Sequence, residues 1–203
     1  MLRLAADRGA RLARLRDEHD TARLWRKAAD EIHADICANA LDERGVFCQY
    51  YGTNALDASL LLMPLMGFLP ADDPRIRATV LAIADELTQD GLVLRYRVDE
   101  TPDGLPGEEG TFTICTFWLV SALARIGEQR RARDLCDKVL SYASPLLLYA
   151  EEIDPRSGRH LGNFPQAFTH LALINAVMHV IADEQAARRK VLQGEAAVVP
   201  WQS

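Results

Sequence analysis

Two adjacent carboxylates, Glu151 and Glu152, are the residues best suited to chemistry in this sequence, and they lie in the segment YAEEIDPRSG. Tyr149 comes just before them, and a turn containing Pro155 follows. A loop carboxylate that faces a cleft can activate water as a general base. Adjacent acids are also common in solvated turns. On the pair alone, the solvated turn is the better interpretation.

The glycine-rich segment GLPGEEGTF holds a second group of candidates, Glu108, Glu109 and Thr111. Glycines allow backbone and acidic side chains to approach a ligand closely. The same three residues could instead cap the helix that follows them. Taken alone, capping is the better interpretation of this segment.

A third segment, LRYRVDE, places Arg95 beside Tyr96 and shortly before Asp99. The guanidinium offers a fork of donors for sugar hydroxyls, and the tyrosine ring offers an apolar face on which a sugar can stack. A surface ion pair between an arginine and an acid explains the same residues equally well.

Two further segments, FCQYYGTNALDAS and LGNFPQAFTH, are dense in amide and aromatic groups. In the second, Asn163, Gln166, Thr169 and His170 lie at the start of an apolar stretch. A single histidine there is more often a satisfied core residue than a catalyst. No segment, taken singly, assigns a function.

The elements that must position these segments are helices, because apolar residues recur at helical spacing through most of the chain. Asp73 followed by Pro74 predicts a helix start, and Gly127 predicts a helix end. No strand of normal length is expected, although residues 47–51 and 92–97 could each pair briefly in a hairpin. We expect helices over residues 1–16, 21–40, 56–66, 74–88, 111–126, 130–142 and 165–182.

Two kinds of helix alternate along the chain. Those over residues 21–40, 74–88 and 130–142 are charged on one face and should lie outside, whereas those starting near 56, 111 and 165 are apolar on most faces and should lie inside. The inner helices recur with a period of about 54 residues, and each follows a long polar loop. This order predicts an all-α fold with about three helical hairpins and all three loops at one end, which is half of an (α/α)₆ toroid.

Composition restricts the remaining possibilities. The chain has 203 residues, enough for one domain, and a net charge of −6, which argues against a nucleic-acid partner. No apolar run reaches the roughly 18 residues of a membrane span, and the N-terminus lacks the pattern of a signal peptide, so we expect a cytoplasmic protein. The four cysteines form no CxxC pair and predict buried thiols, and no metal or other cofactor is expected.

Taken together, the segments resemble a known family. The strings YGTNALDASLL, GFLPADDPR, RYRVDETPDGLPGEEGTFTICTFWLV, YAEEIDPRSG and GNFPQAFTHLALINA resemble the C-terminal half of bacterial glycoside hydrolases of family 15, the glucoamylases and trehalases. The resemblance runs from about Trp25 to Ala182. It implies that residues 1–203 are the C-terminal part of one (α/α)₆ catalytic domain, with residues 183–203 as a poorly packed tail.

The resemblance also implies roles for individual residues. Glu151 matches the general base of the family, and Glu152 matches a polar neighbour. Arg95 matches a sugar-binding arginine and Asp99 an acid that shapes the same subsite. By the same resemblance, Glu109 and Phe112 fall in the loop that walls the pocket.

Tyr149 is expected in the pocket wall as well, because of its place next to the acidic pair. The substrate-binding set expected from the sequence is therefore Arg95, Asp99, Glu109, Phe112, Tyr149 and Glu152.

One carboxylate is missing from this set. An inverting glycosidase needs a general acid about 6.5–9.5 Å from the base. In the family that acid lies in a Trp-Glu motif, but Trp25, Trp118 and Trp201 are each followed by another residue. Glu108 or Glu109 is a less favoured substitute. We therefore expect the acid to come from a missing N-terminal half of the domain or from a partner chain.

A half toroid also leaves the apolar faces of its inner helices unburied. Each large apolar side chain left exposed forgoes about 1.5–3 kcal/mol, against a usual net stability of about 5–15 kcal/mol. The chain by itself is therefore expected to aggregate, to pair with a partner or to belong to a longer polypeptide.

The favoured function is inverting hydrolysis of α-glucosidic bonds, in trehalose or at the non-reducing ends of malto-oligosaccharides, with Glu151 as general base. The alternative is a non-catalytic, carbohydrate-binding or truncated remnant of such an enzyme. A helical-repeat interaction protein is a third interpretation. Its connections would normally be short, and the long polar loops argue against it.

Overall fold

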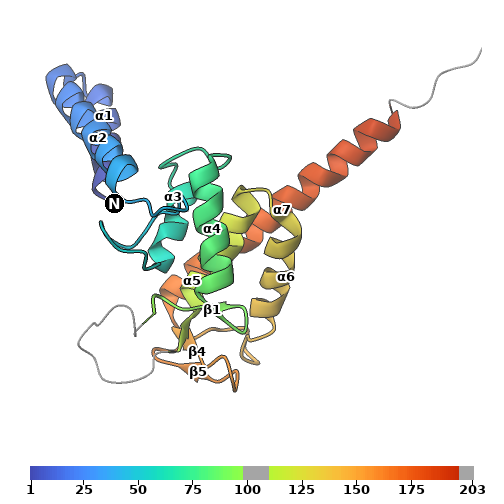
Figure 1. The fold of residues 1–203 in the computed structure, drawn as a ribbon. Helices are drawn as coiled ribbons and strands as arrows, with labels where there is room; N and C mark the ends of the chain where they lie inside the picture. The colour runs from blue at the N-terminus through green and yellow to red at the C-terminus, as the bar shows by residue number, and fades with distance from the viewer. Residues whose placement is uncertain (98–109, 197–203) are drawn as a thin grey trace, which may run out of the picture.

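The computed structural model describes residues 1–97 and 110–196 of the chain (Figure 1). These residues are mainly helical, and none of their helices combines the length and apolar character needed to cross a bilayer. The helices in chain order are α1 (Leu2–Leu15), α2 (His19–Asn39), the 3₁₀ helix η1 (Ala58–Leu61), α3 (Leu62–Leu65), α4 (Pro74–Glu86), α5 (Thr113–Arg125), α6 (Gln129–Leu140) and α7 (Ala167–Ala196).

Helix α5 is the centre of the packing. Ten of its 13 residues are buried, among them Phe117 and Val120. It contacts α3, α4, α6 and α7, while α6 buries only Ala132, Cys136 and Val139 along one stripe. The inner helices α3, α5 and α7 and the outer helices α4 and α6 therefore alternate as expected, and the all-α prediction is confirmed.

The ends of these helices follow the predicted signals. The Asp73 side chain accepts a hydrogen bond from the Arg75 N–H, and Pro74 occupies the first position of α4. Gly127 has φ +84° and ends α5 in a Schellman motif, in which the Glu128 N–H donates to the Leu123 carbonyl at 2.9 Å.

The helix expected over residues 56–66 is shorter and partly 3₁₀. Asp57 caps η1 by accepting a hydrogen bond from the Ser59 N–H, and α3 spans only Leu62–Leu65. Pro64 lacks an N–H, so it fits only within the first turn of an α-helix. Gly67, at φ +67°, then turns the chain away after Met66.

The strands are pairs of residues. β1 (Thr88–Gln89) and β2 (Leu92–Val93) form a hairpin, and its turn residues, Asp90 and Gly91, both have positive φ, as a tight I′ turn requires. Phe47 forms only a bridge with Leu41. A separate antiparallel sheet joins β3 (Thr111–Phe112), β4 (Glu152–Ile153) and β5 (His160–Leu161) in that order.

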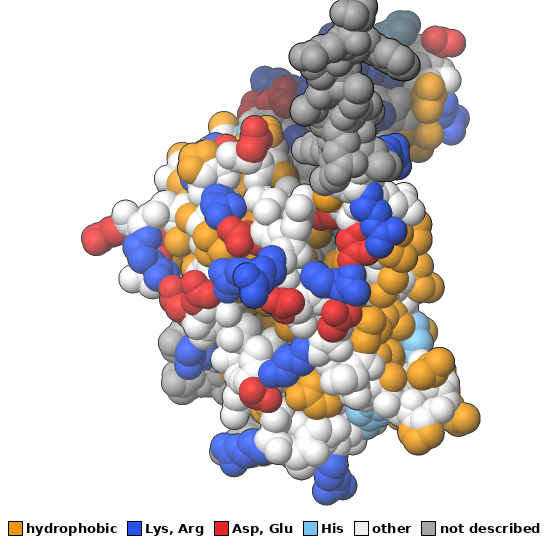
Figure 2. All heavy atoms as spheres, turned by 90° about the vertical axis from the view of Figure 1, so that its right-hand side faces the viewer, with side chains coloured by type: hydrophobic (Ala, Val, Ile, Leu, Met, Phe, Trp, Pro, Cys, Tyr) orange, Lys and Arg blue, Asp and Glu red, His pale blue; other side chains and the backbone are white. Residues whose placement is uncertain are grey.

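One side of the inner helices is uncovered. Along α7, Phe168, Leu171, Ile174 and Met178 are each more than half exposed, although they recur at the spacing of one helix face. Phe168 and Leu171 line an open groove with Trp118 of α5 and with residues of α3. Figure 2 shows hydrophobic side chains gathered along the right-hand edge of one face, while charged side chains occupy its centre.

Helices α1 and α2 form a hairpin that projects from the rest of the chain in Figure 1. At its centre the buried carboxylate of Asp7 pairs with Arg26 at 2.7 Å and with Arg11 at 3.1 Å. Burial alone would raise the pKa of Asp7, but the two arginines outweigh it and lower that pKa. The hairpin is therefore held by a charged contact among small residues such as Ala10 and Ala29.

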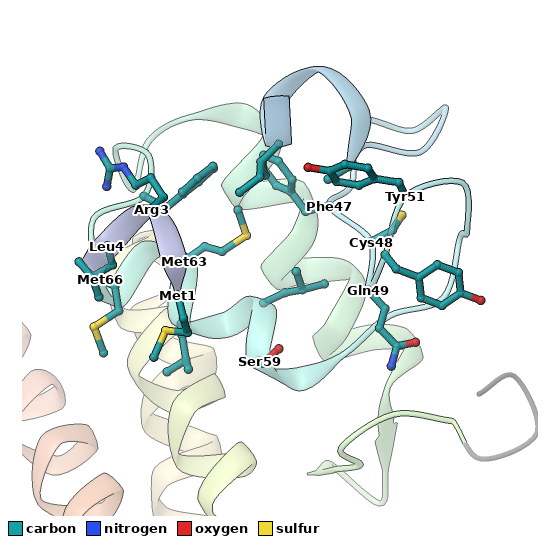
Figure 3. A pocket seen from close by; sticks show the side chains of 16 residues that line it. Met1, Arg3, Leu4, Phe47, Cys48, Gln49, Tyr51, Ser59, Met63 and Met66 are labelled. Atoms are coloured by element: carbon teal, nitrogen blue, oxygen red, sulfur yellow. The ribbon is translucent and has the colours of Figure 1, made fainter. Parts of the chain in front are cut away.

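A pocket of about 350 Å³ lies where this hairpin meets the body. Figure 3 shows Met1 and Leu4, from the start of α1, grouped with Met63 and Met66 on one side of it. Residues 47–51 close the other side. The pocket is mainly apolar, and none of the expected site residues that the structure describes lines it.

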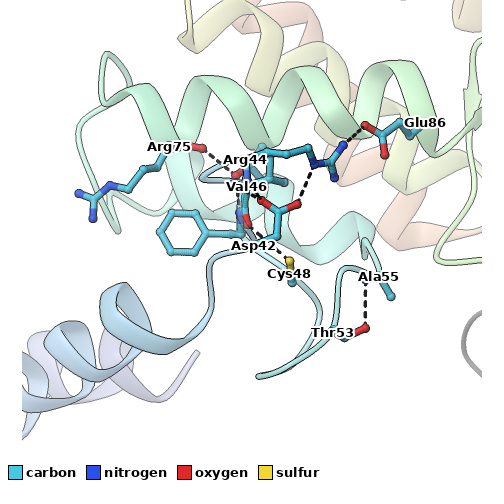
Figure 4. Close-up of polar contacts among 10 residues, drawn as sticks. Asp42, Arg44, Val46, Cys48, Thr53, Ala55, Arg75 and Glu86 are labelled. Atoms are coloured by element: carbon cyan, nitrogen blue, oxygen red, sulfur yellow. Dashed lines mark hydrogen bonds and ion pairs between the residues drawn. The ribbon is translucent and has the colours of Figure 1, made fainter.

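Residues 42–46 turn around the buried carboxylate of Asp42, and the Phe47 N–H donates to the Thr79 hydroxyl of α4 at 2.9 Å (Figure 4). Asp42 accepts hydrogen bonds from the backbone N–H groups of Arg44 and Val46, each at 2.9 Å, and from the Arg44 side chain. Arg44 also reaches Glu86 at the end of α4 at 2.6 Å. Burial would raise the pKa of Asp42, but these donors outweigh it and lower that pKa.

The open face of α7 predicts self-association of the isolated chain, because exposed apolar side chains gain about 25 cal/mol per Å² on burial. Light scattering of the purified chain should give a mass above that of a monomer. Ile174→Glu with Met178→Glu should lower that mass, whereas Arg130→Glu on the outer helix α6 should not. A monomeric chain with a cooperative melt would contradict the prediction.

The Asp42 contacts predict an acid-sensitive stability. Because the folded pKa is depressed, the contribution is complete above the unfolded value of about 3.9 and is lost as the pH falls through the folded pKa. Asp42→Ala should lower the free energy of unfolding by about 2 kcal/mol at pH 7, measured by urea denaturation, and by less at pH 3. The exposed neighbour gives the control, since Glu43→Ala should change little at either pH.

Candidate active site

The three long loops are hydrogen-bonded to one another at the end of the structure where the inner helices begin. The Ala58 N–H donates to the Arg95 carbonyl at 2.8 Å, which joins the first loop to the second. Strand pairing of β3 with β4, extended by a 3.0 Å bond from the Thr113 N–H to the Glu151 carbonyl, joins the second to the third. The expected placement of the loops at one end is confirmed, and we call the three joined loops the loop layer.

Glu151 lies in this layer just before β4. Its side chain is half-buried, and its Oε2 accepts hydrogen bonds from the Asn163 backbone N–H at 3.2 Å and from the Asn163 side-chain amide at 2.9 Å. Among the described residues, nothing donates to Oε1. One carboxylate oxygen is thus oriented and the other remains available to a proton donor.

The Glu152 side chain points to the opposite face from that of Glu151, because successive residues in a strand alternate between the two faces. Its Oε2 accepts a hydrogen bond from the Gly110 N–H at 2.9 Å. A Cβ at Gly110 would lie 2.9 Å from that oxygen and 3.2 Å from the Ile153 carbonyl, so the strands close here only around a glycine. Glu152 therefore fixes the start of β3.

Arg95 and Phe112 lie together in the same layer. The Arg95 guanidinium carbon is 5.1 Å from the centre of the Phe112 ring and 4.5 Å from that of Tyr96, distances at which a cation is attracted to the ring face. Phe112 is paired with Glu152 across the sheet. The structure therefore brings Arg95, Phe112, Glu151 and Glu152 to one end of α5.

Tyr149 occupies a different place from the one expected. Its ring is 2% exposed and packs edge-on against Phe117, and its hydroxyl donates to the Leu140 carbonyl at 3.1 Å. Burial raises its pKa to about 12. Its ring lies in the core between α5, α6 and α7 and not on a surface that a sugar could reach, so its position supports a packing role.

Both ring nitrogens of the half-buried His170 have hydrogen-bond partners, as expected of a structural histidine. Its Nε2 accepts a hydrogen bond from the Tyr149 N–H at 3.3 Å, and its Nδ1 lies 2.7 Å from the Gln166 carbonyl. Two of the expected site residues, Asp99 and Glu109, lie outside the described residues.

Sequence reasoning assigned Gly110 only a general role, with the other glycines of its segment, in close approach to a ligand, and it assigned no role to Gly162 or the Asn163 amide. Gly162 has φ +70°, and a Cβ there would lie 3.0 Å from the Glu151 Oε2. The available signal was a glycine directly before a side-chain amide, within a segment already noted for its polar groups.

Outer and inner helices alternate in this chain, and the loops at one end carry carboxylates. This arrangement is typical of the all-α glycoside hydrolases with a toroidal fold. The chain belongs to the family described as "Glycosyl hydrolases family 15", because the model of that family matches residues 1–178.

The chain is similar in sequence to trehalases. The chain is 71% identical over 184 residues to a trehalase of Mycolicibacterium smegmatis, a match that covers 91% of this chain and 28% of that protein. It is 43% identical over 152 residues to a trehalase of Thermoplasma volcanium, covering 74% of this chain and 24% of that protein. The chain thus spans about a quarter of the length of these relatives.

Solved structures confirm the fold. A bacterial glucoamylase complexed with acarbose superimposes with a TM-score of 0.76 at 15% identity, over 89% of this chain and 32% of that one. A glycosidase variant in complex with glucose gives 0.66 at 20% identity, over 78% of this chain and 44% of that one. The fold of this chain is therefore that of part of the (α/α)₆ toroid.

The close approach at Gly110 generates a stability prediction. Gly110→Ala should lower the free energy of unfolding by about 1–3 kcal/mol, because a methyl group forced against a carboxylate and a carbonyl must displace one strand. Adding Glu152→Ala removes the nearest clash and should recover part of the loss. Urea denaturation of the two single variants and the double variant measures this coupling, and strictly additive losses would show that the contact is unimportant.

Proposed function

We propose that the chain provides the general-base half of the active site of an inverting glycosidase that hydrolyses trehalose, and that Glu151 is the base. The observation that carries the assignment is the contrast between the two acids. Glu152 is engaged by the backbone of β3, whereas Glu151 keeps Oε1 without a donor among the described residues. The similarity to trehalases supports the choice of substrate.

The proposed reaction needs two proton transfers. Oε1 of Glu151 takes a proton from a water molecule as its oxygen bonds to the anomeric carbon, while an acid on the other side protonates the departing glycosidic oxygen. The C–O bond to that oxygen breaks, and the sugar is released with inverted configuration. The acid lies in the part of the domain that this chain does not contain.

The other site residues act on the substrate's hydroxyls and ring faces. Arg95 can donate to adjacent hydroxyls, because its guanidinium presents several N–H groups in one plane, and Phe112 beneath it keeps that plane in place. By the family resemblance, Asp99 helps to shape the subsite of Arg95, and Glu109 belongs to the loop that walls the pocket. Glu152 contributes by holding the strand on which Phe112 lies.

Residues 1–203 are proposed to be the C-terminal part of one catalytic domain, with residues 183–203 at its edge. The exposed side chains of residues 185–189 support this placement of the tail. The open face of α7 is where the remaining helices of the toroid would pack.

Malto-oligosaccharides are the alternative substrates, since the fold is shared with a glucoamylase.

The test uses a hybrid enzyme in which this chain replaces the matching segment of the M. smegmatis trehalase. With the unaltered chain, glucose should be released from trehalose faster than from maltose. Glu151→Gln should lower kcat by about 10²–10⁴-fold, the usual contribution of a general base, whereas Glu152→Gln should leave most of the activity.

Two results would contradict this proposal. Full activity with glutamine at position 151 would show that another group is the base. A folded hybrid that binds trehalose but does not hydrolyse it, even with the unaltered chain, would favour the non-catalytic remnant.

A further inference from the structure

The strongest unassigned feature is the contact between Glu151 and a single residue, Asn163. Both N–H groups that hold the Glu151 Oε2 belong to Asn163, one from its backbone at 3.2 Å and one from its side chain at 2.9 Å. The contact is reciprocal, because the Glu151 N–H donates to the Asn163 carbonyl at 2.9 Å. The carboxylate and its own backbone are therefore tied to the same partner.

The path of the chain makes this contact possible. β4 pairs with β5, and β5 ends at Leu161, opposite Glu152. Gly162 then turns the chain at φ +70°, so that Asn163 returns to Glu151. A Cβ at Gly162 would lie 3.0 Å from the Glu151 Oε2 and 3.1 Å from the Glu151 Cβ, so the turn fits only without a side chain.

The chemistry of the two donors matters. The last torsion of a glutamate is broad, so an unrestrained carboxylate would present either oxygen in many orientations. Two donors on one oxygen fix that torsion and direct the other oxygen. Both donors are neutral amides, and no cationic side chain among the described residues pairs with Glu151. An arginine or lysine in this place would stabilise the carboxylate more strongly and weaken it as a base.

Asn163 contributes little to the core. Its side chain is exposed, and its side-chain bond to Glu151 lies at the surface of the loop layer. The residues that close the third loop onto the body are others, such as Thr169, whose hydroxyl donates to the Ala150 carbonyl at 3.2 Å in a buried position. A change of the Asn163 side chain should therefore alter the carboxylate more than the fold.

We propose that Asn163, brought back by Gly162, is the positioning residue of the base: it holds Oε2 of Glu151 and leaves Oε1 as the oxygen that accepts the proton from water. This inference rests on the proposed function of Glu151. It adds the division of roles between the two carboxylate oxygens and the residue that imposes it.

The test compares variants of the hybrid enzyme by their pH profiles. Asn163→Ala removes the side-chain donor and keeps the backbone one, and kcat should fall about ten- to hundredfold with little change in KM. A carboxylate that loses a donor keeps its proton to a higher pH, so the acidic limb of the profile of kcat should move to higher pH. Asn163→Asp adds a like charge and should move that limb further.

The matched control is another exposed asparagine with a comparable bond. Asn39 near the end of α2 donates from its side chain to the Asp35 carbonyl at 3.0 Å. Asn39→Ala should leave the acidic limb in place. Gly162→Ala should reproduce the shift of Asn163→Ala, because it displaces the carboxylate from its partner, and thermal melts of all variants separate this effect from unfolding.

The outcomes distinguish this inference from the one on which it rests. If Glu151→Gln abolishes turnover but both Asn163 variants keep the acidic limb of the unaltered hybrid, the positioning role is wrong and the base assignment stands. If Glu151→Gln remains fully active, the base assignment itself fails and the positioning role fails with it. A shifted limb in both Asn163 variants, with unchanged melting temperatures, supports the proposal.

Discussion

The burial of α5 is the constraint on which the rest of the structure depends. A helix that is apolar on nearly all sides must be covered on nearly all sides, and α3, α4, α6 and α7 supply that cover. Its N-terminus is consequently surrounded by the loops that enter the neighbouring inner helices. This packing brings the loops together, and the candidate site is where they meet.

Within the loop layer, two short strand pairings place two identical side chains in different surroundings. Glu151 and Glu152 have the same chemistry and adjacent positions, but β4 lies between β3 and β5, so each acid meets a different neighbour. Glu152 bonds to the backbone at Gly110, and Glu151 bonds to Asn163. A glycine is required at each contact because a carboxylate takes the space of the missing side chain.

Much of this could be predicted from the sequence, and the rest could not for physical reasons. Apolar periodicity predicted α5 and its burial, and Asp73 with Pro74 located the start of α4. Tyr149 was misplaced because adjacency to an acidic pair does not say which way a ring points, and Phe117 lies 32 positions earlier in the sequence. The role of Asn163 depends on a turn and a strand register that periodicity cannot show.

The open face of α7 and the position of the loop layer follow from one geometry. In a ring of hairpins, each inner helix is covered by its neighbours and each site loop faces the loops across the ring. Among the described residues, Leu171 and Ile174 on α7 remain exposed. In a complete ring, the hairpins that cover the apolar side chains of an inner helix such as α7 also bring their loops to the end where the loop layer lies, so one packing requirement places both the core and the site.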